Sequence, residues 1–190
     1  MSATVYKITL LGGGAVGKTA LRDSFMGKPF SADYHMTIGA DIAFKSTTID
    51  QREIQFQIWD LAGQPRFELV QPAYYRGSLG SLILFDLARP DTLDQVLDWV
   101  GRLWKFSGKG KVPIILLGNK VDLRKSVATA LQPDKGKAIA ADLSKKSQTA
   151  GFEVPYLETS AKTGKNVEEA FVLLANAIRE FIQFQLEHSK

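Results

Sequence analysis

Short apolar runs alternate with amphipathic segments along the whole chain, which is the pattern of an α/β protein. The apolar runs bounded by turn residues predict buried parallel strands. After a turn at residues 50–52, Ile54, Phe56 and Ile58 alternate with glutamines, which predicts a half-buried antiparallel hairpin with the strand before the turn. The predicted strands lie near residues 8–11, 41–49, 54–58, 81–85, 112–117 and 155–158.

Helical spacing of apolar residues predicts four helices between these strands. They are expected near residues 20–26, from the capping candidates Asp91 and Thr92 to about Trp104, over 133–148, and after Asn166, which has Glu169 three residues on as in a capping box. Residues 61–77 are expected to be irregular. This order predicts a six-stranded, mostly parallel sheet with one antiparallel edge strand and helices on both faces, with ligands at the carboxyl ends of the strands.

Length and composition fit a single globular domain over residues 1–190. Hydrophobic residues make up 45% and charged residues 23%, and the chain has no cysteine, so disulfides, zinc–thiolate sites and thiol-linked lipids are excluded. No apolar run approaches the roughly 20 residues that span a membrane, which favours a cytoplasmic protein. The net charge of +4 could be largely offset by one bound anionic ligand, so we do not predict nucleic-acid binding.

The pattern G-x-x-x-x-G-K-[ST] occupies residues 12–19, directly after the first predicted strand. Its glycines allow the backbone to wrap closely around a phosphate, and the N-terminal end of the following helix attracts the anion. Lys18 is expected to reach the β- and γ-phosphates, and the Thr19 hydroxyl to help hold Mg²⁺. The pattern therefore predicts the α/β fold of a P-loop NTPase. Further nucleotide contacts are expected from Gly12, Gly14, Ala15, Val16, Gly17 and Ala20.

Four further blocks are expected to meet the phosphate loop at one edge of the sheet. Thr37, in the loop after the first helix, can complete the Mg²⁺ shell when a γ-phosphate is present. Asp60, at the end of an apolar strand, suits a partner of Mg²⁺. Gly63 can then offer its N–H to the γ-phosphate, and Gln64 can orient a water. The remaining blocks are Asn119-Lys120-Val121-Asp122 and Ser160-Ala161-Lys162.

These five ordered blocks together resemble the Ras superfamily of small GTPases over nearly the whole chain, and segments 37–41, 59–64 and 74–77 are most similar to the Rab branch. The resemblance implies a switch that binds GTP and GDP with Mg²⁺ and hydrolyses GTP slowly. It implies catalytic roles for Lys18, Thr37 of switch I and Gln64 of switch II. It also implies a guanine site built from Phe30 against the base, from Asn119, Lys120 and Asp122, and from Ser160, Ala161 through its N–H, and Lys162.

The resemblance implies partners as well: an exchange factor, an activating protein and effectors that bind a monomer at the two switches. Leu61 and Pro65 depart from the usual Rab residues beside the site, and Ile42 replaces a phenylalanine of the Rab effector-binding trio. The stretch from 122 to 158 is longer than usual by about ten residues. Because the chain has no cysteine, we expect no direct lipid anchor and no separate C-terminal anchor tail, with membrane association only through partners or a missing tail.

Two alternatives remain open at this point. Leu61 and Pro65 could misplace switch II, which would leave a nucleotide-dependent binding module that hydrolyses GTP poorly. A P-loop ATPase or small-molecule kinase is the other alternative, and the Asn-Lys-x-Asp block at residues 119–122 argues against it.

Overall fold

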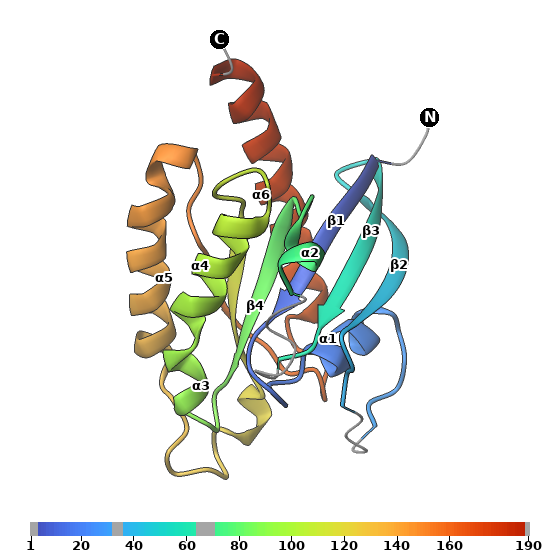
Figure 1. Cartoon of the computed structure of the whole chain (residues 1–190). Coiled ribbons are helices and arrows are strands. Elements are labelled where there is room, and N and C mark those ends of the chain that lie inside the picture. Colours follow the sequence, from blue (N-terminus) through green and yellow to red (C-terminus); the bar gives the residue numbers. More distant parts are fainter. Residues whose placement is uncertain (1–3, 32–35, 64–70, 189–190) are drawn as a thin grey trace.

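The computed structural model describes residues 4–31, 36–63 and 71–188, and a six-stranded sheet forms its centre (Figure 1). The strand order is β2-β3-β1-β4-β5-β6. Edge strand β2 runs antiparallel to β3, and every other neighbouring pair is parallel. The predicted sheet is therefore confirmed. The strands are β1 (Thr4–Leu11), β2 (Ala40–Ile49), β3 (Arg52–Leu61), β4 (Gly80–Asp86), β5 (Ile114–Asn119) and β6 (Tyr156–Glu158).

Helices cover both faces of the sheet, as Figure 1 shows. One face packs against α1 and α6, and the other packs against α4 and α5. The helices are α1 (Lys18–Phe25), α2 (Gln71–Tyr75), α3 (Asp91–Asp94), α4 (Val96–Phe106), α5 (Pro133–Ser147) and α6 (Val167–His188), with short 3₁₀ turns at η2 (Val121–Leu123) and η3 (Gln148–Ala150).

The hydrophobic pattern accounts for the two-sided core. Every residue of β4 is buried, because this central strand has helices on both sides, and its side chains alternate between the two core clusters. On the α1 side, the rings of Phe25 and Phe171 stack with centroids 3.6 Å apart. Each buried aromatic or aliphatic side chain contributes about 1.5–3 kcal/mol, so this packing fixes α1, and with it the phosphate loop, against the sheet.

Helices begin at Asp91 and at Val167, as expected, but the predicted caps at these two starts are wrong. The segment after residue 90 forms two helices, α3 and α4, which meet at Gln95, and Thr92 lies inside the first of them. The Thr92 hydroxyl donates to the Arg89 carbonyl and accepts from the Asp86 N–H, because these groups lie beside it in the folded chain. Asn166 adopts a φ of +55°, and its side-chain amide donates to the Glu158 carbonyl, so it is not the first residue of a capping box.

Candidate functional site

The phosphate loop joins β1 to α1 at the carboxyl edge of the sheet, and two of its glycines are required by the backbone. Gly12 has a φ of +138°, and a Cβ there would lie 2.2 Å from the Leu84 carbonyl oxygen of β4. Gly17 has a φ of +99°, and its Cβ would lie 2.3 Å from Asn119 Nδ2. Since α1 begins at Lys18, the first N–H groups of the helix have no partner within the helix and are available to an anion.

Lys18 is buried against the loop that precedes it. Its Nζ donates to the carbonyl oxygens of Gly12 and Gly13, each at 2.8 Å. Burial lowers the pKa of Lys18 to about 8, the charge of Asp60 opposes this shift, and the charge of Arg89 adds to it. A phosphate beside the ammonium group would favour its charged form again, which suits a residue that binds anions.

The three predicted Mg²⁺ residues meet at one point. Thr19 Oγ1 lies 3.2 Å from Thr37 Oγ1 and donates to Asp60 Oδ2 at 2.5 Å. Asp60 is fully buried, and burial raises its pKa against the opposing effects of Thr19, Lys18 and Arg22. Its second oxygen, Oδ1, has no hydrogen-bond partner among the described residues.

Such an arrangement fits a hydrated Mg²⁺ ion, which prefers hard oxygen ligands and keeps several of its waters. A buried carboxylate oxygen that lacks a partner is the acceptor that a metal-bound water needs, and the two hydroxyls can bind the ion directly. Among the described residues no three histidine, cysteine, aspartate or glutamate side chains gather as a metal site. The hydroxyls of Thr19 and Thr37 therefore make this site distinct from an all-carboxylate one.

A cleft of about 390 Å³ lies beside these residues. Gly63 closes one side of it, and a Cβ at Gly63 would lie 2.4 Å from the Gly12 carbonyl oxygen, so only glycine allows this approach. Phe30 is 47% exposed and lines the cleft, so its ring is accessible for packing against a planar base. Residues that line the cleft include Lys18, Thr19, Phe30, Thr37, Gly63 and Lys120.

Asn119 connects the phosphate loop to the block at 160–162. Its Nδ2 donates to the Val16 carbonyl at 2.8 Å, and its Oδ1 accepts from Thr159 Oγ1 at 3.1 Å and from the Ala161 N–H at 3.3 Å. The sequence predicts that Asn119 holds the guanine, whereas these contacts are all to the protein. Because an amide has two N–H donors, one N–H of Nδ2 remains for a base. Asn119 is in addition a brace, since its side chain ties the phosphate loop to residues 159 and 161.

Asp122 and Ser160 come together from different loops. Ser160 Oγ donates to Asp122 Oδ1 at 2.5 Å, and the hydroxyl in turn accepts from the Thr163 N–H at 3.1 Å. Asp122 is exposed, so its carboxylate is accessible to a ligand. Lys162 is also exposed. Gln64 lies outside the described residues.

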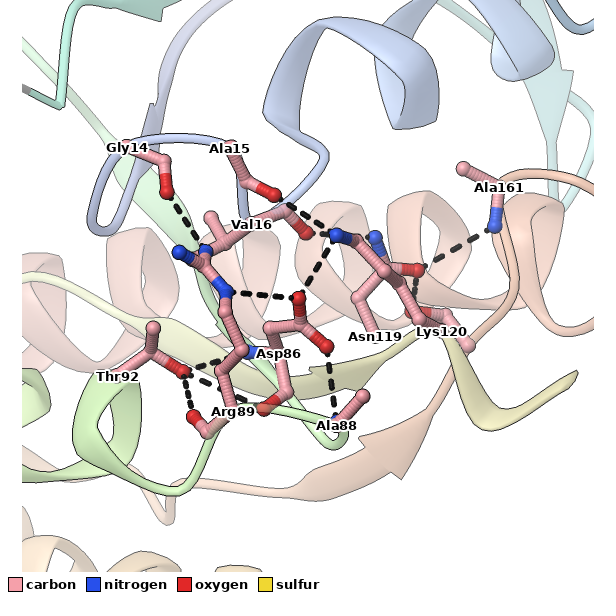
Figure 2. A network of polar contacts seen from close by, with 11 residues as sticks. Gly14, Ala15, Val16, Asp86, Ala88, Arg89, Thr92, Asn119, Lys120 and Ala161 are labelled. Atoms are coloured by element: carbon pink, nitrogen blue, oxygen red, sulfur yellow. Dashed lines mark hydrogen bonds and ion pairs between the residues drawn. The ribbon is translucent and has the colours of Figure 1, made fainter. Parts of the chain in front are cut away.

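Sequence reasoning missed two residues of the site, Asp86 and Arg89. Figure 2 shows them beneath the phosphate loop, in a network with Lys120 and Asn119. Asp86 is the last residue of β4, and its side chain is buried. An acid at the end of an apolar strand is the same signal that identified Asp60, so this residue could have been found from sequence.

Arg124 and Glu158 form a bidentate salt bridge close in sequence to the blocks at 119–122 and 160–162. Arg124 donates to both Glu158 oxygens at 2.5 Å, and Tyr156 Oη donates to one of them at 2.9 Å. Burial alone would raise the pKa of Glu158, but the hydrogen bonds from Arg124 and Tyr156 outweigh it and the pKa is lowered. Arg124 also donates to the Leu131 carbonyl, so it fixes the longer loop that leads to α5.

Glu158→Gln is expected to lower the free energy of unfolding by about 1 kcal/mol at pH 7 and by much less in acid. Because the folded-state pKa of Glu158 is lowered, the unfolded chain binds more protons as the pH falls. The stabilisation is therefore complete above about pH 4.3, the unfolded pKa, and is lost as the pH falls below it. Urea unfolding at pH 7 and near pH 3 measures this, with the exposed Glu153→Gln as control. An equal loss at both pH values would contradict the role of the bridge.

Taken together, a phosphate loop at the carboxyl edge of a mostly parallel sheet, with hydroxyl and carboxylate groups beside it, defines a P-loop nucleotide-binding protein. A family model described as "Ras family" matches residues 7–180. "Ras-related protein RABA6a" of Arabidopsis thaliana is 37% identical over 178 residues, 94% of this chain and 71% of that protein. "Ras-related protein RABA6b" of the same plant is 36% identical over 178 residues, which cover 94% of this chain and 72% of that protein.

The chain belongs to the Ras family, and within it the chain is Rab-like. It is a small GTPase, a molecular switch that binds GTP and GDP and hydrolyses GTP. This membership excludes the ATPase and small-molecule kinase alternative. No helix within residues 4–31, 36–63 and 71–188 combines the length and the apolar character needed to cross a membrane.

Proposed function

We propose that Lys18, Thr19, Thr37 and Asp60 bind the phosphates of GTP together with Mg²⁺, and that this cluster is the sensor of the switch. The observation that carries the proposal is that the Thr19 hydroxyl contacts both the Thr37 hydroxyl, at 3.2 Å, and Asp60 Oδ2, at 2.5 Å, while the other, buried oxygen of Asp60 has no hydrogen-bond partner among the described residues. When bound, Mg²⁺ would neutralise charge on the β- and γ-phosphates. Thr19 and Thr37 would hold it directly and Asp60 through its water.

GTP hydrolysis requires the protein mainly to position the reacting groups and to stabilise the charge of the transition state. Lys18 sits between the loop carbonyls and the cleft, so its ammonium group can bind phosphate oxygens without losing its two bonds to Gly12 and Gly13. Gly63 passes directly beside Gly12, which lets its N–H approach the γ-phosphate. Gln64, the next residue, would orient the attacking water.

Switching follows from where Thr37 and Gly63 lie. Both come from connecting segments rather than from helices, and both line the cleft: Thr37 contacts Thr19, and Gly63 lies beside Gly12. Their contacts to a γ-phosphate would order these segments in the GTP form, and hydrolysis would remove those contacts. The order of residues near 37 and 63 is thus the signal that partners would detect.

The effector surface differs from the common Rab pattern. Trp59 and Tyr74 lie with ring centroids 5.9 Å apart, and Ile42 pairs with Trp59 across β2 and β3. Phe44, two residues along β2, is exposed on the same face as Ile42 because side chains alternate along a strand. We propose that this altered surface recognises its own effectors, that an exchange factor and an activating protein act on the switches, and that the protein is a cytoplasmic monomer regulating membrane traffic through such partners.

Gln64→Leu is expected to slow single-turnover GTP hydrolysis about tenfold or more, equivalent to about 1.4 kcal/mol in barrier. Leucine cannot orient a water, while the contacts of the phosphate loop and base remain. The measurement is the rate of GDP formation from a preformed GTP complex, with GDP affinity as the internal control. Hydrolysis at the wild-type rate with unchanged affinity would show that Gln64 is not catalytic.

A further inference from the structure

Three consecutive carbonyl oxygens of the phosphate loop are each bound by a side chain that lies at least 75 residues away in the sequence (Figure 2). Arg89 follows β4, Asn119 is the last residue of β5, and Lys120 follows it, so the carboxyl ends of these two strands hold the loop. The bonds run from Arg89 Nη2 to the Gly14 oxygen at 2.7 Å, from Lys120 Nζ to the Ala15 oxygen at 2.9 Å, and from Asn119 Nδ2 to the Val16 oxygen at 2.8 Å.

Holding a carbonyl group also orients the next N–H group. In a planar trans peptide the C=O and the N–H point in opposite directions. Binding of the Gly14 oxygen by Arg89 therefore turns the Ala15 N–H away from Arg89, toward the cleft that Gly14 and Ala15 line. Ala15 has a φ of +59°, which costs a residue other than glycine about 1–2 kcal/mol, so this conformation needs external support.

Asp86 anchors two of the three side chains. It is 1% exposed, and its Oδ2 accepts from Lys120 Nζ at 2.7 Å and from Arg89 Nε at 3.1 Å. The other oxygen, Oδ1, accepts from the Ala88 N–H at 2.9 Å. A single buried carboxylate thus fixes both cations. Arg89 connects this carboxylate to the phosphate loop, because its guanidinium group has N–H donors that point in two directions.

We propose that Arg89 is a positioning residue of the phosphate loop: anchored by Asp86, it holds the Gly14 carbonyl so that the adjacent N–H faces the phosphates, and it thereby slows nucleotide release. The inference rests on the proposed nucleotide site and adds to it a residue that touches neither phosphate nor base. It also links the loop to Lys120 through Asp86, so the phosphate and guanine ends of the site share one anchor.

The test compares release of a fluorescent GDP analogue from the full chain and from the variants Arg89→Ala, Arg89→Lys and Arg179→Ala. Arg179 is the matched control, because its guanidinium group donates to Asp50 at 3.0 Å, far from the loop in sequence, and its side chain is 33% exposed against 41% for Arg89. We expect Arg89→Ala to release nucleotide about tenfold faster. Arg89→Lys should recover part of the loss, since lysine keeps the charge without the fork, and Arg179→Ala should match the wild type.

Phosphorus NMR of bound GDP provides the readout that simple destabilisation would not change. Arg89→Ala should move the β-phosphorus resonance, and Arg179→Ala should leave it in place. Release within twofold of the Arg179→Ala rate, or faster release with an unmoved resonance, would overturn the positioning role while the nucleotide site stands. Wild-type protein that binds no GDP would instead overturn the proposed site, and the inference with it.

Discussion

Gly17→Ala is expected to weaken the binding of GDP and GTP at least about 100-fold, equivalent to about 2.8 kcal/mol. The new Cβ would lie 2.3 Å from Asn119 Nδ2, and a φ of +99° disfavours any side chain at this position. Asn119 cannot move aside cheaply, because its amide is bonded to Val16, Thr159 and Ala161. The collision would therefore displace either the phosphate loop or the brace that connects it to the base site. Titration with a fluorescent GDP analogue measures the loss.

Gly27→Ala is the matched control for this experiment. Gly27 also has a positive φ, of +79°, but a Cβ there would meet no atom within 4 Å. The two variants therefore share the backbone cost and differ in the collision with Asn119. If Gly17→Ala lost no more affinity than Gly27→Ala, the contact between the phosphate loop and Asn119 would not control nucleotide binding.

The sheet and the meeting of the phosphate residues could be predicted because both depend on local sequence. The unbroken apolar run of β4 indicates burial on both faces, and the alternation in β3 indicates a half-covered strand. Residues at the carboxyl ends of parallel strands must lie at one edge, which places Asp60 and Asn119 near the phosphate loop. The prediction for Thr19 and Asp60 follows from this topology and the preference of Mg²⁺ for oxygen. The role of Thr37, a single threonine in the loop after α1, is implied instead by the resemblance to small GTPases.

Side-chain partners across long sequence distances could not be predicted in the same way. The sequence predicts a helix cap at Thr92, but the fold brings the Asp86 N–H and the Arg89 carbonyl beside its hydroxyl. Arg89 in sequence is one of many surface cations, and only the fold shows its bond to Gly14, 75 residues away. Asn119 likewise holds the phosphate loop through a hydrogen bond to the Val16 carbonyl, 103 residues away. These roles depend on which loops become neighbours, which no local pattern encodes.

Base selection is expected to depend on Asp122. Ser160 holds one oxygen of this carboxylate at 2.5 Å, which fixes the group and leaves Oδ2 for a ligand. A carboxylate accepts hydrogen bonds only, and guanine offers two adjacent donors, N1–H and the exocyclic amino group. Adenine has an acceptor at N1, so it would leave the carboxylate without partners at a cost above about 1–3 kcal/mol. Wild-type protein should therefore bind GTP far more tightly than ATP.

Asp122→Asn is expected to lower GDP affinity at least about 100-fold, or about 2.8 kcal/mol, and to raise affinity for xanthosine nucleotides. The amide keeps an oxygen for Ser160 and presents N–H donors where Oδ2 stood, which suits the oxo group that xanthine has in place of the guanine amino group. Competition by GTP, ATP and XTP against a fluorescent GDP analogue measures both effects. Asp134→Asn, at an exposed position in the first turn of α5, removes the same charge without approaching the base and should leave the preference unchanged. An Asp122→Asn protein with the wild-type order of preference would show that Asp122 does not face the base. Replacing an acceptor oxygen by a donor amide can change the preferred base only if the side chain contacts that base.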